Sequence, residues 1–545
     1  MISKQKSFEK VLSQKQSIAV GTIILLVANI LKSASMLINN ILIAAIFGAS
    51  YLTDGFFLAY LITVRFGLAM SLCVNFVLIP NLSKFNEKMG KSQVSDLVSA
   101  FFNNILLLAA VGTVLFYVAV PWIITLFSEI GKNLGFSMDE ATLGVIINNT
   151  RALTPTLLFF MAYSLYQAFL YSHKQFLVPA LGSLLPSIGI IVGAISLSKV
   201  YGIYSLAIGV ILGTLLQVLS QLPAAKAKGL KYKRFMKWRQ ADISRMRHDI
   251  ELMVLIVALS QVVVTIDKFF ASTLDEGSVT ALTFAGTVLR LAPTLFHFSL
   301  LSSALPTLTE YIAQDDWSDF QILFNRLLRL IGLLMVPVTV LFFIIGLPVV
   351  QLIYERGKFD AEASMLTYTA IQYYAIGFFA YALQGPFIQA LYILRKFTFI
   401  LVWTVITIFF TTLLNYLFMS WMGFKGLPLA FSIIMFIHLI ACYVVMRGYI
   451  PDFKLIRAGR EFTIMLVAGL IMFLSVKGSF SLATTYLPPE GIIALLLKII
   501  LPGLVGALVY LAALFVFRSR DLELLLLKIR TSVNGNKTQE EDSIK

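Results

Sequence analysis

FGASYLTDGFFLAYLITVRFGLAM, residues 47–70, begins as a short polar loop and continues as an apolar run that carries a single charge, Arg65. Apolar runs of about 20 residues, the length an α-helix needs to cross ~30 Å of hydrocarbon, follow one another from Ile18 to Phe517. A strand-like period of two is absent, and unpaired backbone groups cannot lie in lipid. The sequence therefore predicts an all-α polytopic membrane protein with about fourteen transmembrane helices.

The composition agrees with this class. Of the 545 residues, 59% are hydrophobic and only 13% are charged, and the mean hydropathy of +0.87 lies far above that of soluble globular proteins. The sequence contains no G-x-x-x-x-G-K-[ST] loop, metal-ligand cluster or nucleophile triad, and no segment between the predicted helices is long enough for a catalytic domain. We therefore expect neither an enzyme nor a bound cofactor. Cys73 and Cys442 are predicted to be small core residues.

The distribution of basic residues predicts the orientation of the helices. With the N-terminus in the cytoplasm, 31 of the 43 Lys and Arg residues fall on the cytoplasmic side, as the positive-inside rule requires. An even number of helices places both termini there, and the charged start MISKQKSFEK is not that of a cleavable signal peptide. The net charge of +15 is thus mainly a topology signal, and anionic membrane lipids are its expected partner instead of nucleic acid.

Similar stretches recur at a nearly constant distance along the chain. IPNLSKF at 79–85 resembles LPTLTEY at 305–311, and LYSHKQF at 170–176 resembles LYILRKF at 391–397. A repeat with an even number of helices predicts two pseudo-symmetric six-helix lobes of the same orientation, as in transporters built from parallel repeats. The expected division is a cytoplasmic N-terminus at 1–17, an N-lobe at 18–224, a basic cytoplasmic linker at 225–249, a C-lobe at 250–448, a C-terminal helix pair at 449–517 and a polar cytoplasmic tail at 518–545.

Arg65 lies deep in its predicted helix. It follows Asp54, at the outer end, by eleven residues, which is about 16 Å at 1.5 Å per residue. An ionised side chain near the centre of a bilayer costs at least ~2.5 kcal/mol, so it tends to face a cavity or a partner. Arg290 falls within one residue of the position equivalent to Arg65 in the repeat, and Lys32 is also deep.

Polar residues at helical spacing accompany these cations, which favours a water-filled cavity lined by the first two helices of each repeat. No carboxylate near mid-membrane opposes the cations, so the cavity is expected to be strongly positive. The predicted substrate-binding cations are Lys32, Arg65, Arg290 and Lys268, and the predicted polar lining is Asn29, Asn39, Asn40, Asp54, Gln261, Thr265, Thr283, Thr287, Thr294 and His297.

Plainer roles stay open for several of these residues. Lys268 follows Asp267 and would also serve as half of an interfacial ion pair, and His297 would also serve as a packing residue. Arg65 and Arg290 would also pair with helix C-termini. Hydrogen bonds between helices alone would account for Thr283 or Thr287. Shallow positions predict that two further cations extend toward the membrane surface, namely Arg151 and Lys498.

A deep cationic cavity suits an anionic cargo. Guanidinium groups bind phosphate with matched geometry, and an inside-negative potential would favour the outward movement of a lipid pyrophosphate by about 2.3 kcal/mol per charge per 100 mV. We therefore expect transport without ATP, with coupling to the membrane potential or to a monovalent ion.

Four stretches resemble the MurJ (MviN) family of the multidrug/oligosaccharidyl-lipid/polysaccharide exporter superfamily. They are FGASYLTDGFF at 47–57, Pro80 at the end of the second helix, YERGKFDAEASMLTYTAIQYYAIGF at 354–378 and LYILRKFTFILVWTVITIFFTTLLNYLFMSWMGFKGLPLA at 391–430. The resemblance implies two six-helix lobes, two further helices that form a groove for a polyprenyl tail, and alternating access. It also implies movement of lipid II, the peptidoglycan precursor, across the bacterial cytoplasmic membrane, in contact with cell-wall or polysaccharide assembly machinery.

The chain departs from the family pattern at its charged motifs. Asp54 matches the family's Thr-Asp, and Arg65 lies within a residue or two of its paired arginines. The family's Arg-Asp in the first helix is replaced by Asn39 and Asn40, its Ala-Glu-Gly after the paired arginines has no counterpart at 68–71, and its Asp-Arg in the eighth helix aligns with 286–287. Our hypothesis is that the missing charge comes from neighbouring positions, Lys32 and Arg290.

The preferred function is a flippase for a polyprenyl-pyrophosphate-linked saccharide, with lipid II as first choice. A flippase for another lipid-linked repeat unit, of an exopolysaccharide or capsule, is the main alternative. A drug/cation antiporter fits less well because cation export needs acidic groups in the membrane. A non-transporting membrane scaffold is the fourth hypothesis.

Overall fold

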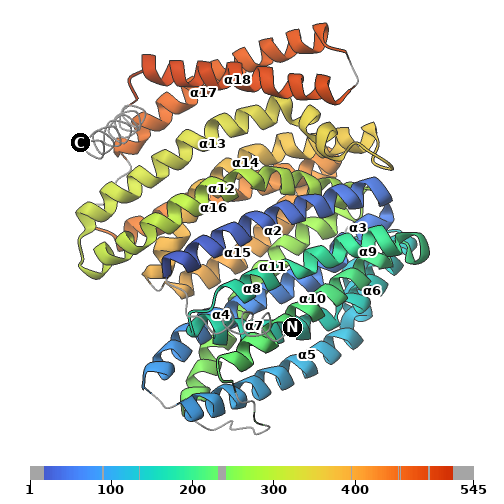
Figure 1. Cartoon of the computed structure of the whole chain (residues 1–545). Helices are drawn as coiled ribbons and strands as arrows, with labels where there is room; N and C mark the ends of the chain where they lie inside the picture. Colours follow the sequence, from blue (N-terminus) through green and yellow to red (C-terminus); the bar gives the residue numbers. More distant parts are fainter. Residues whose placement is uncertain are drawn as a thin grey trace, which may run out of the picture. The chain divides into compact units, whose positions relative to one another are not determined.

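The computed structural model describes residues 18–88, 91–133, 135–230, 233, 241–394, 396–451, 453, 456–488 and 491–519. Within these ranges the regular secondary structure is helical throughout (Figure 1). The expected N-terminal segment at 1–17 and nearly all of the expected tail lie outside the described residues. The helices have the following bounds: α2 Ile18–Phe47, α3 Tyr51–Tyr60, η1 Leu61–Arg65, α4 Phe66–Lys88, α5 Lys91–Asn133, α6 Glu140–Leu153, α7 Pro155–Ser172, α8 Leu177–Gly182, α9 Leu185–Tyr201, α10 Tyr204–Ala227, α11 Ala241–Ala271, α12 Ser278–Ala313, α13 Trp317–Tyr354, α14 Ala361–Ile393, α15 Phe397–Met422, η2 Gly423–Lys425, α16 Gly426–Tyr449, α17 Ile456–Tyr486 and α18 Ile492–Val516.

The number of membrane-spanning helices agrees with the sequence. Among the described residues, 11 helices are long and apolar enough to cross a membrane. One of these spans, Thr398–Tyr449, contains two helices, α15 and α16, joined by the short η2. When α15 and α16 are counted as two spans and the long helices α11 and α12 are added, the total agrees with the about fourteen spans expected from hydropathy. The chain is an all-α polytopic membrane protein, as predicted.

The chain divides into two compact units. Unit 1 comprises Met1–Thr283, Arg356–Ala363 and Trp403–Tyr416, and unit 2 comprises Phe284–Glu355, Ser364–Val402 and Leu417–Lys545. These bounds differ from those of the expected lobes, because α11 packs against α4 and so joins unit 1. The twofold repeat inferred from the sequence stays a prediction.

Unit 1 is built from pairs of closely packed helices, of which α9 with α10 and α4 with α7 make the most extensive contacts. The α9–α10 pair is close because glycines face each other. A Cβ added to Gly209 would overlap the carbonyl oxygen of Gly189, and one added to Gly189 would overlap that of Gly209. Without a hydrophobic driving force in lipid, such backbone proximity supplies the dispersion contacts that hold membrane helices together.

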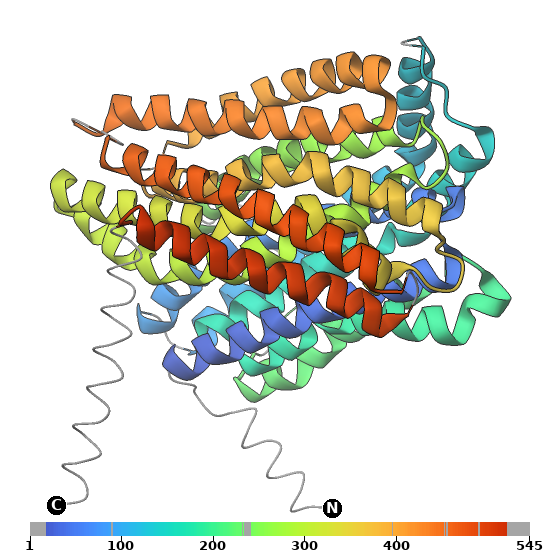
Figure 2. The same ribbon diagram turned by 90° about the horizontal axis from the view of Figure 1, so that it is seen from above.

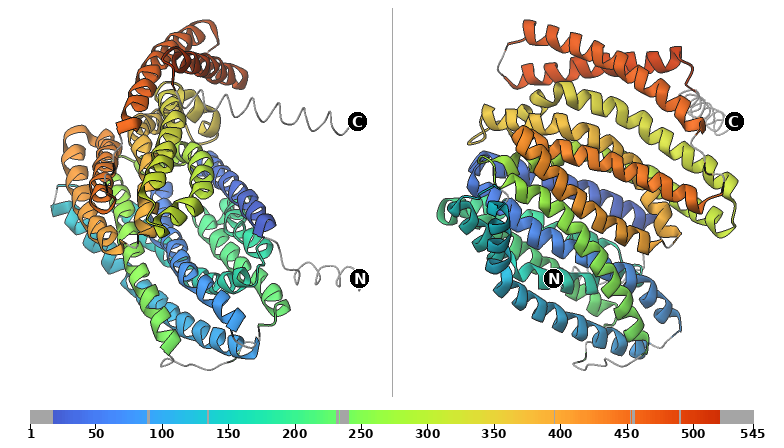
Figure 3. Two further views of the ribbon diagram at one scale, coloured as in Figure 1. Left: turned by 90° about the vertical axis from the view of Figure 1, so that its left-hand side faces the viewer. Right: turned by 180° about the vertical axis from the view of Figure 1, so that it is seen from behind.

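In unit 2 the last two helices, α17 and α18, run side by side and both pack on α13 (Figure 2, Figure 3). Buried methionines fill this interface: Met465 and Met472 of α17 are fully buried beside Tyr510 of α18. The Tyr510 hydroxyl donates a hydrogen bond of 3.2 Å to the carbonyl oxygen of Leu333 on α13. α17 and α18 are therefore tied to a neighbouring helix.

Two smaller expectations also have an outcome in the structure. Cys73 and Cys442 are both free and buried, as predicted. Lys498 donates a hydrogen bond of 3.0 Å to the carbonyl oxygen of Pro488, which precedes the first turn of α18. This is expected of a side chain that extends toward the end of its span. Arg151 instead lies over the ring of Tyr117 on α5, 5.4 Å from the ring centroid, which is a cation–π contact.

Candidate functional site

Arg65 closes a π-helical turn in the second membrane span. α3, η1 and α4 form one continuous helix from Tyr51 to Lys88, and the π turn occupies Leu61–Arg65. Within this turn the Thr63 hydroxyl donates to the carbonyl oxygen of Ala59 at 2.6 Å. A π turn contains one extra residue, so it rotates the side chains that follow relative to a regular α-helix, and such turns are frequent at functional sites. The turn therefore determines which way the Arg65 side chain faces.

Arg65 extends toward α2, the first membrane helix. Its Nη2 lies 3.8 Å from the Sδ atom of Met36. Met36 follows Lys32 by one helical turn, so the two occupy the same face of α2. Arg65 therefore reaches the face of α2 that carries Lys32. The structure thus brings together two of the four predicted substrate-binding cations, from separate helices.

The polar residues of α2 divide between two environments. Asn29 and Lys32 have exposed side chains, whereas Asn39 and Asn40 are buried, with 5% and 4% of their surface exposed. The exposed pair lies three residues apart and shares one face of the helix with the Arg65 contact. Asn29 and Lys32 are therefore the α2 residues that a ligand of the cation pair would meet.

Asp54 caps another membrane helix. Its Oδ2 accepts a hydrogen bond of 2.8 Å from the N–H of Gly277, and its Oδ1 accepts from the N–H and the hydroxyl of Thr280 at 2.8 and 2.6 Å. These donors belong to the N-terminal end of α12, where a carboxylate satisfies free N–H groups and interacts favourably with the helix dipole. Asp54 is 3% exposed, so in this conformation it is buried at a helix end instead of lining an open cavity.

A third segment closes the same end of unit 1. The loop between α13 and α14, which carries the ERGKFD sequence, donates the N–H of Lys358 to the carbonyl oxygen of Ala45 at 3.0 Å. Gly357 has a φ of +63°, and a Cβ there would overlap the Ala45 backbone. The Asp54 cap thus ties α3 to α12, and this contact ties the loop to the end of α2.

The α12 stripe divides between the two units. Thr283 is half-buried and donates to the carbonyl oxygen of Val279 at 2.7 Å, Thr287 is buried at 6% exposure, and Arg290 is exposed. Thr283 belongs to unit 1, and Thr287 and Arg290 belong to unit 2. The side chains of Thr294 and His297 lie outside the described part of the chain.

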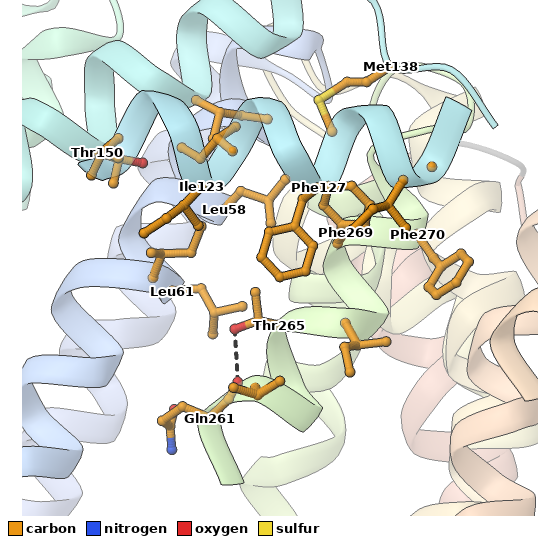
Figure 4. A pocket seen from close by; sticks show the side chains of 18 of the residues that line it. Leu58, Leu61, Ile123, Phe127, Met138, Thr150, Gln261, Thr265, Phe269 and Phe270 are labelled. Atoms are coloured by element: carbon orange, nitrogen blue, oxygen red, sulfur yellow. Dashed lines mark hydrogen bonds between the residues drawn. The ribbon is translucent and has the colours of Figure 1, made fainter. Parts of the chain in front are cut away.

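The predicted residues of α11 have other surroundings. The carboxylate of Asp267 accepts a hydrogen bond of 2.7 Å from the Nδ2 of Asn415 on α15, and the charge of Lys268 acts on the same carboxylate. The role of Lys268, in the cavity or as half of an ion pair, stays a prediction. Gln261 and Thr265 line an apolar cavity, and the Thr265 hydroxyl donates to the carbonyl oxygen of Gln261 at 2.8 Å (Figure 4).

Three residues that matter to this arrangement were not predicted from the sequence: Met36, Thr280 and Asn415. Met36 and Thr280 carried no signal, because a thioether or a threonine in an apolar helix is common. Asn415 did carry one, since an amide inside an apolar run is expensive unless it is hydrogen-bonded.

The comparisons with known proteins match most of the chain. The family model described as "Lipid II flippase MurJ" matches residues 43–502. A probable lipid II flippase MurJ of Buchnera aphidicola subsp. Schizaphis graminum is 25% identical over 425 residues, which cover 76% of this chain and 81% of the relative. The lipid II flippase MurJ of Burkholderia cenocepacia is 25% identical over 414 residues, covering 74% and 79%.

Solved structures share the fold. A lipid II flippase MurJ in an inward closed conformation superposes with a TM-score of 0.74 at 21% identity, covering 91% of this chain and 98% of the other. An inward-facing multidrug resistance MATE family transporter of the MOP superfamily superposes with a TM-score of 0.60 at 14% identity, covering 78% and 98%.

Proposed function

The chain belongs to the family of the lipid II flippase MurJ, and on this premise we propose that it moves lipid II from the inner to the outer leaflet of the bacterial cytoplasmic membrane. The cargo in this proposal is a polyprenyl-linked saccharide whose pyrophosphate carries the charge. The protein then acts as a transporter and catalyses no covalent step. In this membrane both of its termini are cytoplasmic, as the distribution of basic residues favours.

The observation that supports this function best is the pairing of Lys32 and Arg65. Two like charges on neighbouring membrane helices repel each other, and the repulsion is relieved when an anion binds between them. A guanidinium presents a fork of donors to phosphate oxygens, and an ammonium supplies a mobile point charge. A pyrophosphate has both the charge and the oxygen atoms to engage the two groups at once.

The contacts at the closed end of unit 1 support alternating access. Asp54 ties α3 to α12, and Lys358 ties the ERGKFD loop to α2, through hydrogen bonds that a rearrangement can break and remake. A flippase must close one side of its path while the other is open, and hydrogen-bonded helix ends provide such a closure. In this mechanism the membrane potential drives the anionic headgroup outward, by about 2.3 kcal/mol per charge per 100 mV.

The test is depletion of this protein in its own host, with chemical labelling of lipid II in the outer leaflet. Wild-type protein, Arg65→Gln and Lys32→Gln are supplied to the depleted cells at matched levels. Lys199→Gln is the matched control, because Lys199 is an exposed cation in the last turn of α9. We expect depletion to remove surface lipid II. The wild type and the Lys199 variant should restore it, and neither Arg65→Gln nor Lys32→Gln should do so.

Normal surface lipid II after depletion would overturn the proposed cargo. Loss of another surface glycan in the same cells would then identify an exopolysaccharide or capsule repeat unit as the cargo. If both Arg65→Gln and Lys32→Gln restored surface lipid II fully, lipid II would still be the proposed cargo, but the role of the cation pair would be refuted.

A further inference from the structure

Unit 1 contains a large apolar cavity that the transport site does not explain. Its volume is about 470 Å³, and it lies among the α3–η1–α4 helix, α5, α6, α11 and α15 (Figure 4). The loop between α5 and α6 covers one end with Phe136 and Met138. Leu61 and Ile62 of the π turn also line it, so the turn that carries Arg65 forms part of the cavity wall.

The lining offers almost nothing to a polar ligand. Aliphatic and aromatic side chains dominate it, among them Leu58, Phe127 and Phe269 (Figure 4). The Thr265 hydroxyl already donates to the backbone of its own helix, and those of Thr273 and Thr412 do the same, at 2.8 and 2.9 Å. The remaining polar groups of the lining are the Gln261 amide and the buried hydroxyl of Thr150, which has no hydrogen-bond partner among the described residues. Because the rest of the wall is apolar, an apolar occupant is favoured.

The mouth of the cavity opens where hydrocarbon is expected. Its rim includes side chains that are substantially exposed, at 37% for Ile123, 41% for Phe127 and 39% for Val262. Ile123 and Phe127 belong to the candidate membrane span Val98–Asn133 on α5. Only 11% of the most apolar stretch of this span is buried inside the protein. The wall atoms of an empty cavity lack dispersion contacts on one side, so a neighbouring lipid chain is favoured to fill the space.

The length of the cavity fits a chain from one leaflet. Its lining extends from Phe116 to Gly131 on α5, and a rise of fifteen residues of helix spans about 22 Å. One leaflet contributes about half of the ~30 Å hydrocarbon thickness, so a single acyl chain fits along this wall and a much longer polyprenyl chain does not. Lys132, exposed in the last turn of α5, directly follows the lining residue Gly131 and places a positive charge at that end.

We propose that this cavity is a binding site for one acyl chain of an anionic membrane phospholipid, whose phosphate lies at Lys132. The bound chain packs against Leu61 and Ile62, on the π turn that carries Arg65. The phospholipid is a resident ligand of the fold and is distinct from the transported cargo.

The full-length protein in nanodiscs of phosphatidylglycerol and phosphatidylethanolamine tests this site. A phosphatidylglycerol probe with a diazirine in its acyl chain is photolysed, and the labelled residues are mapped by mass spectrometry. We expect about ten-fold more label on the cavity-lining residues of α5 and α11 than on lipid-facing α9 residues. Val192 and Ile195 are the α9 references, at 55% and 63% exposure.

Three variants sharpen the result. Ala258→Trp and Val262→Trp each place an indole in the cavity, and we expect either to reduce the lining label about ten-fold, whereas Ile195→Trp on α9 leaves it unchanged. Mapping of the wild type remains decisive if a filled variant does not fold. Lining residues labelled no more than Val192, or label that persists in a folded filled variant, would overturn the proposal.

A second probe separates the two possible sources of the chain. A polyprenyl phosphate with the same diazirine should label the lining weakly, and excess phosphatidylglycerol should abolish that label. Strong polyprenyl labelling that phosphatidylglycerol does not reduce would also overturn the proposal. Neither labelling experiment measures transport, so a result that overturns the phospholipid site leaves the proposed movement of lipid II unaffected.

Discussion

Replacing Asp54 by alanine should open the closed end of unit 1. The Asp54 carboxylate accepts three hydrogen bonds of 2.6–2.8 Å from Gly277 and Thr280, at the start of α12. Alanine removes both acceptor oxygens and leaves two backbone N–H groups of the α12 end without their partner. These groups then gain by moving toward water, which separates α12 from α3.

The magnitude follows from the number and type of these bonds. A hydrogen bond to a charged group contributes about 1.5–3 kcal/mol, and a carboxylate at a helix N-terminus contributes ~0.3–1 kcal/mol more through the dipole. The carboxylate is 3% exposed, so the cost of its desolvation offsets part of this sum. We expect a net loss of about 3 kcal/mol, which changes the ratio of open to closed forms on the order of 150-fold.

A buried cysteine reports the opening. Ser278, the first residue of α12, is 1% exposed, and Ser278→Cys is a nearly isosteric change. The native Cys73 and Cys442 are buried and remain in place. The measured quantity is the rate at which a membrane-impermeant maleimide modifies the new thiol in vesicles. We expect Asp54→Ala to raise this rate about 100-fold.

Two further variants determine how the result is interpreted. Thr53→Val removes the 3.0 Å hydrogen bond from the Thr280 hydroxyl and the local bonds of the Thr53 hydroxyl to Gly48 and Ser50, but it leaves the Asp54 cap in place, so its effect should be about ten-fold or less. Asp54→Asn keeps the shape of the side chain but loses one acceptor, so its rate should lie between those of the wild type and Asp54→Ala. A folded Asp54→Ala protein whose rate stays within about two-fold of the parent would refute the reasoning, because it would show that the cap does not hold α12.

Three other predictions follow from the helix contacts. Gly209→Val should lower the melting temperature of the purified protein, because its side chain would overlap the backbone of Gly189; an unchanged melting temperature would mean that α9 and α10 can separate at no cost. Asn415→Leu should destabilise the protein by about 1–3 kcal/mol in denaturant titration, since Asp267 loses a 2.7 Å hydrogen bond, and a more stable variant would contradict this. Arg65→Lys keeps the charge but loses the planar fork, so pyrophosphate binding measured by calorimetry should weaken about ten-fold, and equal affinity would show that charge alone suffices.

The helical architecture was predictable because length and apolarity leave few alternatives. A run of about 20 apolar residues in lipid must satisfy its backbone internally, and only a helix does so along a single chain. The depth of Arg65 follows in the same way from its distance to the polar loop at Asp54. Burial of Cys73 and Cys442 also follows from their position within apolar runs.

The environment of individual polar residues was less predictable. Gln261 and Thr265 recur at helical spacing, a pattern that favoured the lining of a cationic cavity. In the structure both line the apolar cavity, because a threonine hydroxyl in a helix can donate to a carbonyl of its own preceding turn and then needs no water. Helical spacing shows that residues share a face, but it does not show what that face meets.

The sequence by itself determined that this chain is a many-span helical membrane protein and that a cation lies deep in its second span. Tertiary structure alone decided that Arg65 meets α2 beside Lys32, because a π turn rotates the helix by an amount that no local pattern reveals. It likewise decided that Asp54 caps α12, since its partner Thr280 lies 226 residues away in sequence. Apolar length acts locally along the chain, whereas the choice of partner for a polar group depends on which helices pack together.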